Sequence, residues 1–547
     1  MSSPSKIRVA GPARVRFLLV KGSVMLAFAL LAGRLVWVQG VMRTDYQQKA
    51  DRRTASVASA STARNSILDR DGRVLVDNVQ VYSCFADPTL IKDRAATARA
   101  VAPWLRMDPR TVSEKIASAR GSFVWIKRNV SPDAVQLIKE KQVPGIGFRV
   151  ETRRHYPTGP IATHLLGMVG FDGNGLSGVE QAFEPTLNAR RGGGKLPAGH
   201  VKLTIDARIQ RIVERELDWG GHKTGAKRGI AVVQDPNNGE ILAMAAWPPM
   251  SLEPERPPKP GDMRVPALVD AFEPGSTFKI VTAAAVLEEN LIHPGEMFNG
   301  ENGKWKVYNA TIHDHEPRAL LSFDDILIYS SNIGAAKLAE RLGAEKLYQY
   351  ARLFGFGAPP GSCLPSESKG LLRPPSQWSG LSKYTISFGQ EVSVTALQLV
   401  GAYSAIANGG QLLEPRVVSA IVGDDGKPLW QNPPAVVRRV VSDKTAKDIA
   451  RVLALVVKKG TGVNAQIQWD PSMEVAGKTG TAQKYDRAHH RYNDTLSLVS
   501  FCGFFPARQA KYTILVLYDE PEGRSWGGLD AAPVFRRIAE QLSPRTL

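Results

Sequence analysis

Cysteine is scarce in this chain of 547 residues, which contains only three. Cys84, Cys363 and Cys502 cannot all pair, and none has a C-x-x-C partner or the spacing of a metal ligand. The sequence therefore excludes a disulfide framework and predicts three buried or inert thiols. No internal repeat is present either.

Acidic residues are missing from the first 44 positions, where seven basic residues occur, and the first carboxylate is Asp45. The chain carries a formal net charge of +18, of which +11 remains from Asp45 onward. Such a surface suits anionic lipid headgroups or anionic wall polymers. Ordinary solubility charge is the alternative interpretation, and the composition does not separate the two.

One mainly apolar run covers residues 17–38 and is 22 residues long. As a helix it would extend about 33 Å, which is enough for a hydrocarbon core of about 30 Å. Lys21 and Arg34 lie near its ends, where long side chains can reach the interface. The preceding basic residues predict a cytoplasmic N-terminus and a single-pass protein of the cytoplasmic (inner) membrane, with its remainder in the periplasm or extracytoplasmic space. A cleaved signal peptide is the alternative.

Three short motifs occur in a fixed order: STFK at 276–279, SSN at 330–332 and KTGT at 478–481. Together they supply a hydroxyl nucleophile, a nearby amine base, a polar relay, and a cation with backbone donors for an anionic substrate. This set is typical of penicillin-binding proteins and class A β-lactamases. The pattern therefore indicates acyl transfer through a serine.

Each motif alone is a weak signal, because residues 3–6 and 366–369 also match S-x-x-K and residues 223–225 also match K-T-G. The flanking residues separate the catalytic motifs from these additional matches. Glu-Pro-Gly precedes Ser276, and residues 277–289 form an apolar, Ala-rich helical pattern, so Ser276 is expected at a helix N-terminus. Lys279 lies one turn further on the same face, within reach of the hydroxyl.

Two hairpins and a mixed sheet-and-helix pattern indicate the fold class. Asp71-Gly72 and Asn238-Gly239 each join two short apolar segments, as in β-hairpins. Residues 496–505 and 512–518 are predicted strands, and 532–542 is a predicted helix. These elements predict an α/β (α+β) sandwich around an antiparallel sheet, with a domain boundary near 215–228.

With these pieces in place, the chain resembles a class B penicillin-binding protein over nearly its whole length. The pedestal pattern of that family appears at Arg64, Ile67, Asp69, Arg70, Gly72, Tyr156, Pro157, His164, Gly167, Gly178, Val179 and Glu180. The transpeptidase pattern appears at 273–276, 330–332, Thr395, Gln398, 478–481 and 532–535. Two positions depart from the family: Asn65 and Glu391 stand where Gly is commoner.

The resemblance implies a cytoplasmic tail at 1–16, a transmembrane helix at 17–38, a stalk and an elongated pedestal (dimerisation-type) domain at 39–220, and a transpeptidase domain at 221–547. It also implies a peptidoglycan D,D-transpeptidase that cross-links stem peptides, releases the terminal D-Ala and is acylated by β-lactams. No cofactor, metal or nucleic acid is expected.

The resemblance assigns a role to each motif residue. Ser276 would attack the donor carbonyl, Lys279 would take the hydroxyl proton, Ser330 would relay a proton to the leaving amine, and Asn332 would orient Lys279 and the substrate. Lys478 is expected to lower the pKa of Lys279 as a neighbouring cation, together with desolvation. Two further groups complete the site: an oxyanion hole from the backbone N–H groups of Ser276 and Thr481, and carboxylate-binding residues Lys478, Thr479, Gly480 and Thr481.

Other interpretations of individual residues stay open. Residues 313–316 (HDHE) have the composition of a metal cluster, although a loop that shapes the site is favoured. Ser330 is also placed to cap the helix that follows it. His489 and His490 are expected in an exposed loop.

Rival functions are a D,D-carboxypeptidase, a β-lactamase, a membrane β-lactam sensor and a non-catalytic division scaffold. The pedestal, the single predicted membrane span and the complete motif set favour the transpeptidase. Glu-Pro-Gly before Ser276 and the short 248–266 loop resemble the division-type (FtsI-like) branch, with an elongation-type enzyme as the alternative. The expected partners are a SEDS-type glycosyltransferase and other division proteins.

Overall fold

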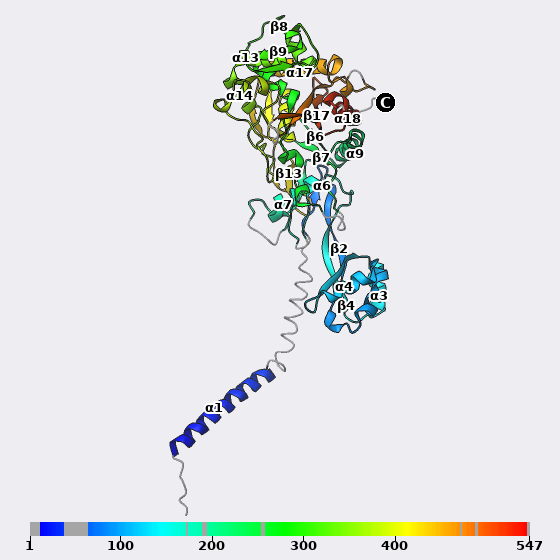
Figure 1. Cartoon of the computed structure of the whole chain (residues 1–547). Coiled ribbons are helices and arrows are strands. Elements are labelled where there is room, and N and C mark those ends of the chain that lie inside the picture. Colours follow the sequence, from blue (N-terminus) through cyan, green and yellow to red (C-terminus); the bar gives the residue numbers. More distant parts are fainter. Residues whose placement is uncertain are drawn as a thin grey trace, which may run out of the picture. The chain divides into compact units, whose positions relative to one another are not determined.

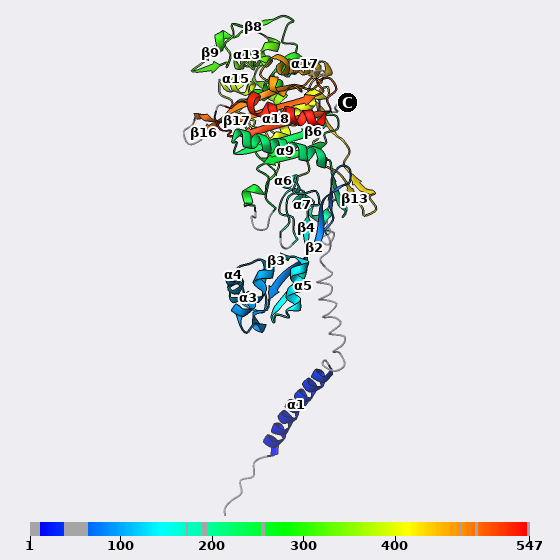
Figure 2. The ribbon, with the colours of Figure 1, turned by 90° about the vertical axis from the view of Figure 1, so that its right-hand side faces the viewer.

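A computed structural model describes residues 11–37, 64–170, 173–188, 194–252, 258–470, 473–486, 491–523 and 525–543. It divides into two compact units, one formed by residues 1–63 with 79–153 and the other by residues 64–78 with 154–547. Figures 1 and 2 show the elements of both units. The predicted stalk at 39–60 and the histidines 489 and 490 lie outside the described residues.

Helix α1 (Gly11–Val36) contains most of the predicted membrane segment 17–38, which extends past the described residues at its end. Judged by length and hydropathy, none of the helices in the described ranges qualifies to cross a bilayer.

The rest of the first unit is a small α/β body. It contains residues 79–86 of strand β2 (Val74–Ala86), strands β3 (Val124–Val130) and β4 (Ile146–His155), and helices α3 (Arg94–Leu105), α4 (Pro109–Ala117) and α5 (Pro132–Glu140). Each helix starts at an N-cap side chain that accepts backbone N–H bonds: Asp93, Asp108 and Ser131. Apolar residues of these helices pack on β2 and β3 to form the core of this unit.

A seven-stranded sheet has the order β14-β13-β5-β1-β2-β3, and β4 also pairs with β2. In the second unit it contains β1 (Ile67–Leu68), the start of β2, β5 (His200–Leu203), β13 (Val418–Val422) and β14 (Pro428–Gln431). Strand β1 pairs antiparallel with β2 and parallel with β5. The predicted hairpin at 71–72 is confirmed, and Gly72 adopts φ +86°, a left-handed conformation that suits glycine.

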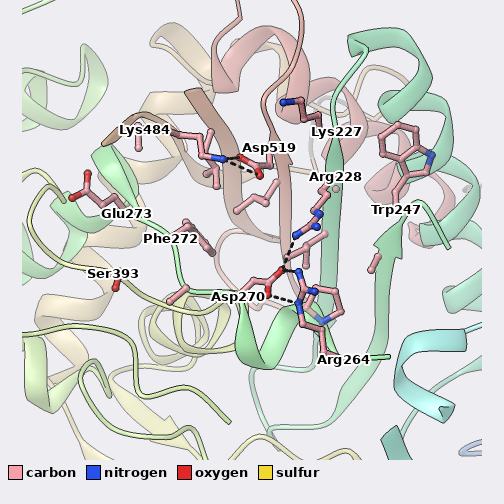
Figure 3. A pocket seen from close by; sticks show the side chains of 18 of the residues that line it. Lys227, Arg228, Trp247, Arg264, Asp270, Phe272, Glu273, Ser393, Lys484 and Asp519 are labelled. Carbon is pink, nitrogen blue, oxygen red and sulfur yellow. Dashed lines mark hydrogen bonds and ion pairs between the residues drawn. The ribbon is translucent and has the colours of Figure 1, made fainter. Parts of the chain in front are cut away.

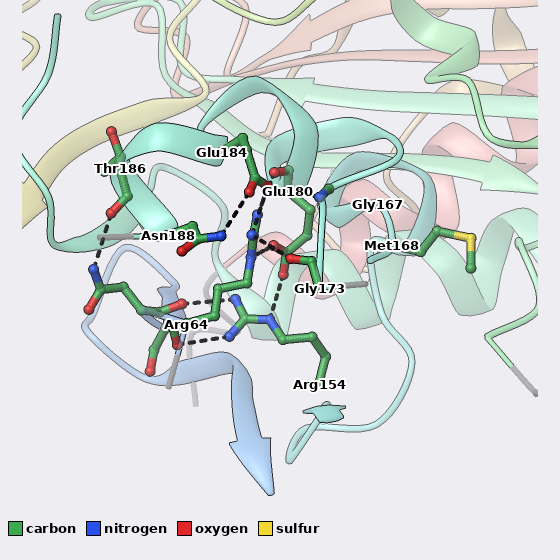
Figure 4. Close-up of polar contacts among 12 residues, drawn as sticks. Arg64, Arg154, Gly167, Met168, Gly173, Glu180, Glu184, Thr186 and Asn188 are labelled. Atoms are coloured by element: carbon green, nitrogen blue, oxygen red, sulfur yellow. Dashed lines mark hydrogen bonds and ion pairs between the residues drawn. The ribbon is translucent and has the colours of Figure 1, made fainter. Parts of the chain in front are cut away.

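Buried charges join three segments beside this sheet (Figure 4). The Glu180 carboxylate is fully buried and accepts from Arg64 Nε at 2.5 Å and from Arg154 Nε at 2.7 Å. Arg64 also pairs with Glu184 at 2.7 Å. Short helices α6 (Thr163–Leu166), α7 (Gly178–Ala182) and α8 (Glu184–Leu187) carry the acidic partners or lie next to them.

Another sheet of the same unit has five antiparallel strands in the order β16-β17-β18-β6-β7. The strands are β6 (Arg228–Gln234), β7 (Ile241–Trp247), β16 (Ala476–Asp486), β17 (Arg491–Phe505) and β18 (Tyr512–Asp519). The predicted hairpin at 238–239 and the two predicted strands near the C-terminus are confirmed. The predicted helix at 532–542 is confirmed as the end of α18 (Gly527–Leu542), which starts five residues earlier.

Alternating side chains give this sheet two apolar faces, because successive residues of a strand point to opposite sides. Ala231 and Val233 of β6 pack with helix α9 (Ala207–Thr224) and α18 on one face. Ile230 and Val232 pack toward the opposite core, which contains α11 (Lys279–Glu288), α13 (Asn332–Leu342), α16 (Ala396–Ala407) and α17 (Asp443–Lys459). The predicted sandwich of an antiparallel sheet flanked by helices is therefore confirmed.

The remaining elements surround this core. Helices α10 (Pro266–Val269), α12 (Phe323–Ile328), α14 (Ala344–Leu353) and α15 (Ser382–Ser387) lie between the two ends of the sheet in sequence. Short two-stranded ladders pair β8 (Met297–Asn299) with β11 (Leu320–Ser322), β9 (Lys304–Val307) with β10 (Ala310–His313), and β12 (Gln411–Leu413) with β15 (Val436–Arg439).

Candidate active site

Ser276 lies in a 3-10 turn, Gly275–Phe278, that leads directly into α11. Gly275 adopts φ +54°, and its N–H donates to the Gly389 carbonyl at 3.1 Å. The predicted helix after Ser276 is confirmed, although its α-helical part starts at Lys279. The turn presents Ser276 at the entrance of a buried helix, with its side chain partly exposed.

The Lys279 amine is the centre of the site. Its Nζ lies 3.1 Å from Ser276 Oγ, 3.2 Å from Ser330 Oγ, 2.5 Å from the Ser330 carbonyl and 2.8 Å from Asn332 Oδ1. The side chain is 1% exposed. The structure thus brings four of the predicted site residues together around one nitrogen.

The surroundings of Lys279 favour a neutral amine. Burial lowers its pKa well below the usual range, and the nearby charge of Lys478 lowers the pKa further. The Asp314 carboxylate acts in the opposite direction. The expected direction of the pKa shift and its two causes are confirmed.

The SSN motif forms the turn between α12 and α13. Ser330 adopts φ +59°, an uncommon conformation for a residue with a side chain, and it directs both its carbonyl and its hydroxyl toward Lys279. The prediction that Ser330 caps the following helix is wrong: Ser331 is the N-cap of α13 and accepts from the Gly334 N–H at 2.8 Å. The reason is that the positive φ turns Ser330 away from the helix start.

The KTGT motif occupies strand β16. Lys478 is fully buried, and its Nζ lies 3.3 Å from both the carbonyl and the hydroxyl oxygen of Thr479. Burial lowers the pKa of Lys478 to about 7. The Thr479 hydroxyl is 2.8 Å from that of Thr461, and Thr481 is exposed.

Gly480 allows β16 to pack against the nucleophile turn. A Cβ atom at this position would lie 2.4 Å from Ser500 Oγ, 2.9 Å from the Pro274 carbonyl and 2.9 Å from Thr277 Cγ2. Because β16 is the edge strand of its sheet and pairs with β17, its other side is available to an extended ligand beside Ser276. The absence of a side chain at Gly480 therefore serves the packing of the protein itself.

Several contributors to the site carry no recognisable spacing signal. Asp314 follows β10 and accepts hydrogen bonds from Ser331, Asn332 and Ile333. The sequence pattern placed it only in a loop expected to shape the site. Its contacts arise from the β9–β10 ladder, which local periodicity did not indicate.

Glu273 lies three residues before the nucleophile and meets the loop that contains Glu391. Its carboxylate accepts from the Glu391 N–H at 3.0 Å and from the Tyr492 hydroxyl at 3.2 Å. Burial, together with the charge of Glu391, raises the pKa of Glu273 to about 6. The segment before Ser276 is thus held from two sides.

The two departures from the family pattern are accommodated locally. Glu391 adopts φ +58°, which explains why glycine is commoner there, and its side chain pairs with Arg373 at 2.8 Å and accepts from Thr385 at 2.6 Å. Asn65 donates to the Thr186 carbonyl at 3.1 Å.

A cavity of about 1280 Å³ adjoins the site (Figure 3). Glu273, Ala482 and Gln483 belong to its lining, whereas Ser276 and Lys279 do not. Several of its charged side chains form ion pairs: Arg264 contacts Asp270 at 2.7 Å, and Lys484 contacts Asp519 at 3.1 Å. The cavity is therefore a neighbour of the nucleophile and not its immediate surroundings.

The three thiols take no part in this arrangement. Cys84 and Cys502 are buried and Cys363 is exposed, and burial raises the pKa of all three. Within the described ranges, no group of three or more His, Cys, Asp or Glu side chains could hold a metal ion.

Two protein families match the chain. Residues 229–540 match the family described as "Penicillin binding protein transpeptidase domain", which is more than half of the chain, and residues 59–198 match the "Penicillin-binding Protein dimerisation domain". The chain belongs to the class B penicillin-binding proteins. It is a serine-type peptidoglycan D,D-transpeptidase, as the family resemblance implied.

Similar class B penicillin-binding proteins come from distant bacteria. The chain is 32% identical to stage V sporulation protein D of Bacillus subtilis, covering 97% of this chain and 85% of that protein. It is 31% identical to the peptidoglycan D,D-transpeptidase FtsI of Escherichia coli, covering 96% and 90%. The crystal structure of penicillin binding protein 3 from Mycobacterium tuberculosis, complexed with aztreonam, has a TM-score of 0.68 at 30% identity and covers 88% of this chain and 95% of that one.

Proposed function

We propose that this transpeptidase cross-links stem peptides through an acyl-enzyme on Ser276 and acts in septal wall synthesis during cell division. The observation that carries the chemistry is the contact between Lys279 Nζ and Ser276 Oγ at 3.1 Å. The division role is supported by the similarity to FtsI proteins. The chain is also similar to a protein named for stage V of sporulation.

The contacts of Lys279 are those of a general base. A neutral amine has two N–H donors and one lone pair. The Ser330 carbonyl and Asn332 Oδ1 can only accept, and they are the two shortest contacts of Nζ. The lone pair then remains for a hydroxyl, and Ser276 Oγ–H is in reach to donate its proton as it attacks the donor carbonyl.

The remaining groups complete acyl transfer. The N–H groups of Ser276 and Thr481 would stabilise the oxyanion of the tetrahedral intermediate, each worth about 3–4 kcal/mol in comparable sites. Ser330 would pass the proton from Lys279 to the leaving amine of D-Ala. Lys478, with Thr479 and Thr481, would bind the terminal carboxylate of the donor, and Asn332 would orient Lys279 and the substrate backbone.

Deacylation of Ser276 follows the same steps in reverse, with an acceptor amine in place of D-Ala. The amine of a neighbouring stem peptide attacks the ester carbon, forms the new amide bond and transfers one proton through Lys279 back to Ser276 Oγ. β-Lactams present a strained amide to the same nucleophile and are expected to acylate Ser276. The relative named above was crystallised with a β-lactam, aztreonam.

The proposed location is the cytoplasmic membrane, with a single N-terminal span, the N-terminus in the cytoplasm and the catalytic domain outside. The basic N-terminal segment and the apolar run at 17–38 support this proposal. The proposed partners are a SEDS-type glycosyltransferase and other division proteins. Fluorescence imaging of the tagged protein in dividing cells tests the division role: it should accumulate at the septum, and an even distribution along the side wall would favour elongation.

Labelling with fluorescent penicillin tests the nucleophile. Ser276→Ala should abolish the covalent label, because the other hydroxyl that contacts Lys279 among the described residues, that of Ser330, is proposed to relay a proton and not to attack. Ser366→Ala is the matched control, since Ser366 and Lys369 have the same S-x-x-K spacing in a loop and the label should persist. Incubation with lipid-linked pentapeptide and a polymerising partner should yield cross-linked dimers. Release of D-Ala without dimers would replace the transpeptidase by a carboxypeptidase.

A further inference from the structure

Asn332 is held on two sides by one short segment of chain. Its side-chain Nδ2 donates to the His313 carbonyl at 3.0 Å, and its backbone N–H donates to Asp314 Oδ1 at 2.6 Å. The other polar atom of its side chain, Oδ1, accepts from Lys279 Nζ at 2.8 Å. The position of the catalytic amine therefore depends on a residue whose own contacts come from 313–314.

The Asp314 carboxylate binds the start of α13 through three donors. Oδ1 accepts from the N–H groups of Asn332 and Ile333, the latter at 3.0 Å, and Oδ2 accepts from the Ser331 hydroxyl. The first N–H groups of a helix have no partner inside it, and the helix dipole favours a negative charge at this end. Asp314 supplies both the acceptor and the charge, although it lies 17 residues before Ser331.

The β9–β10 ladder sets the position of Asp314. β10 ends at His313, and the Asp314 N–H donates to the Gly303 carbonyl at 3.1 Å, just before β9 begins. The carboxylate is thus attached to a paired strand end, while the groups it binds belong to a separate helix. The ladder therefore fixes the position of Asp314, and Asp314 acts on the Lys279 amine through Asn332.

We propose that Asp314 is a positioning residue for acyl transfer, which fixes Asn332 and, through it, the Lys279 amine against Ser276. The proposal rests on the roles proposed above for Ser276 and Lys279.

The charge of Asp314 has a second effect. Lys478 from β16 and Asp314 from the end of β10 are the charged groups that act on Lys279, with opposite signs. Removing the carboxylate charge favours the neutral amine, whereas removing the whole side chain also releases Asn332.

Two substitutions separate position from charge. Asp314→Asn keeps an oxygen for the two N–H groups and an amide that can donate to Ser331, but it removes the charge. Asp314→Ala removes both. The measurement is the rate of Ser276 acylation by fluorescent penicillin in the full-length protein, as a function of pH.

Asp314→Asn should keep most of the maximal acylation rate, and the midpoint of the acidic limb should move to lower pH, because Lys279 loses its proton more easily. Asp314→Ala should lower the maximal rate on the order of 10- to 100-fold, since small displacements of a catalytic group have effects of this size. A wild-type maximal rate in Asp314→Ala, or an unchanged midpoint in Asp314→Asn, would overturn the proposal.

Asp206 provides the matched control. It is the N-cap of α9 and accepts from the N–H groups of Arg208 and Ile209 outside the site. Asp206→Asn and Asp206→Ala should change the thermal stability but neither the maximal rate nor the midpoint. The failure of this proposal can be told apart from the failure of the proposed function. Label that persists on Ser276→Ala refutes the nucleophile. Asp314 variants with wild-type acylation refute only the role of Asp314.

Discussion

Lys279 and Lys478 are both buried, but the proposed chemistry requires opposite protonation states. The base must be neutral when Ser276 gives up its proton, whereas the carboxylate-binding group must be an ammonium. Lys279 is surrounded by three side-chain oxygens and a carbonyl, while Lys478 contacts only atoms of Thr479 among the described residues. Both groups are lysines, so the difference in their protonation states must come from their different contacts and neighbouring charges.

A bell-shaped pH dependence follows from this difference. Acylation should rise with pH as Lys279, whose pKa is well below normal, loses its proton. It should fall as pH increases through about 7, where free Lys478 loses the charge that binds the carboxylate. The measurement is the second-order acylation rate across pH. Lys478→Arg should shift the alkaline fall upward, because a guanidinium stays protonated. A profile that stays flat above neutral pH in the wild type would contradict this assignment.

At the scale of elements, the active site is a junction between the 3-10 turn before α11, the turn before α13 and the edge strand β16. At Gly480 the strand and the nucleophile turn approach closely, because a side chain there would overlap Pro274 and Thr277. The spacing between Ser276 and Thr481 depends on this contact.

Gly480→Ala should separate the strand from the nucleophile turn. Its Cβ would meet a backbone carbonyl at 2.9 Å, which cannot move without shifting the turn. The acylation rate should fall at least about 10-fold, as expected for a displaced oxyanion donor. Stopped-flow acylation and thermal unfolding measure the two effects.

Gly401→Ala is the control for this substitution. Gly401 lies inside α16, and the nearest atom to an added Cβ is Leu412 Cδ1 at 3.9 Å. Alanine there should raise the stability by about 0.5–1 kcal/mol through its helix propensity, with an unchanged acylation rate. Equal losses in both variants would argue against the packing role of Gly480.

Elements with local signals were predictable from the sequence. The hairpins at 71–72 and 238–239, the helix after Ser276 and the strands near the C-terminus depend on nearby residues, and they are confirmed. The capping of α13 was not predictable, because Ser330 and Ser331 are chemically alike and only the positive φ of Ser330 distinguishes them. Asp314 was not assigned to the SSN motif, because the ladder that positions it leaves no periodic pattern.

At the scale of the whole molecule, the chain joins distant segments through buried charges. Arg64, Arg154 and Glu180 come from three parts of the sequence, and each is at most 7% exposed. The family resemblance pointed to Arg64 and Glu180, but the pairing itself depends on the folded chain. A buried ion-pair cluster of this kind adds little net stability to the protein. Removing one member, however, leaves another buried charge without a partner.

Glu180→Ala should destabilise the protein by about 3–5 kcal/mol, because the buried Arg154 guanidinium would lose its carboxylate and Arg64 would keep only Glu184. Thermal and denaturant unfolding of the full-length protein measure this. Asp448→Asn removes an exposed i,i+4 pair with Lys444 and should change the stability by less than about 0.5 kcal/mol. If the two substitutions lowered the free energy of unfolding by similar amounts, the buried cluster would contribute no more than the exposed pair.

The burial of Lys478 also has a consequence for the stability of the protein. Lys478 is fully buried and makes no ion pair with a described residue, and burying a charge without a partner costs free energy. In the proposed function, the carboxylate of a donor peptide or of a β-lactam would pair with the Lys478 ammonium. Such a ligand is therefore expected to stabilise the folded protein against unfolding and proteolysis.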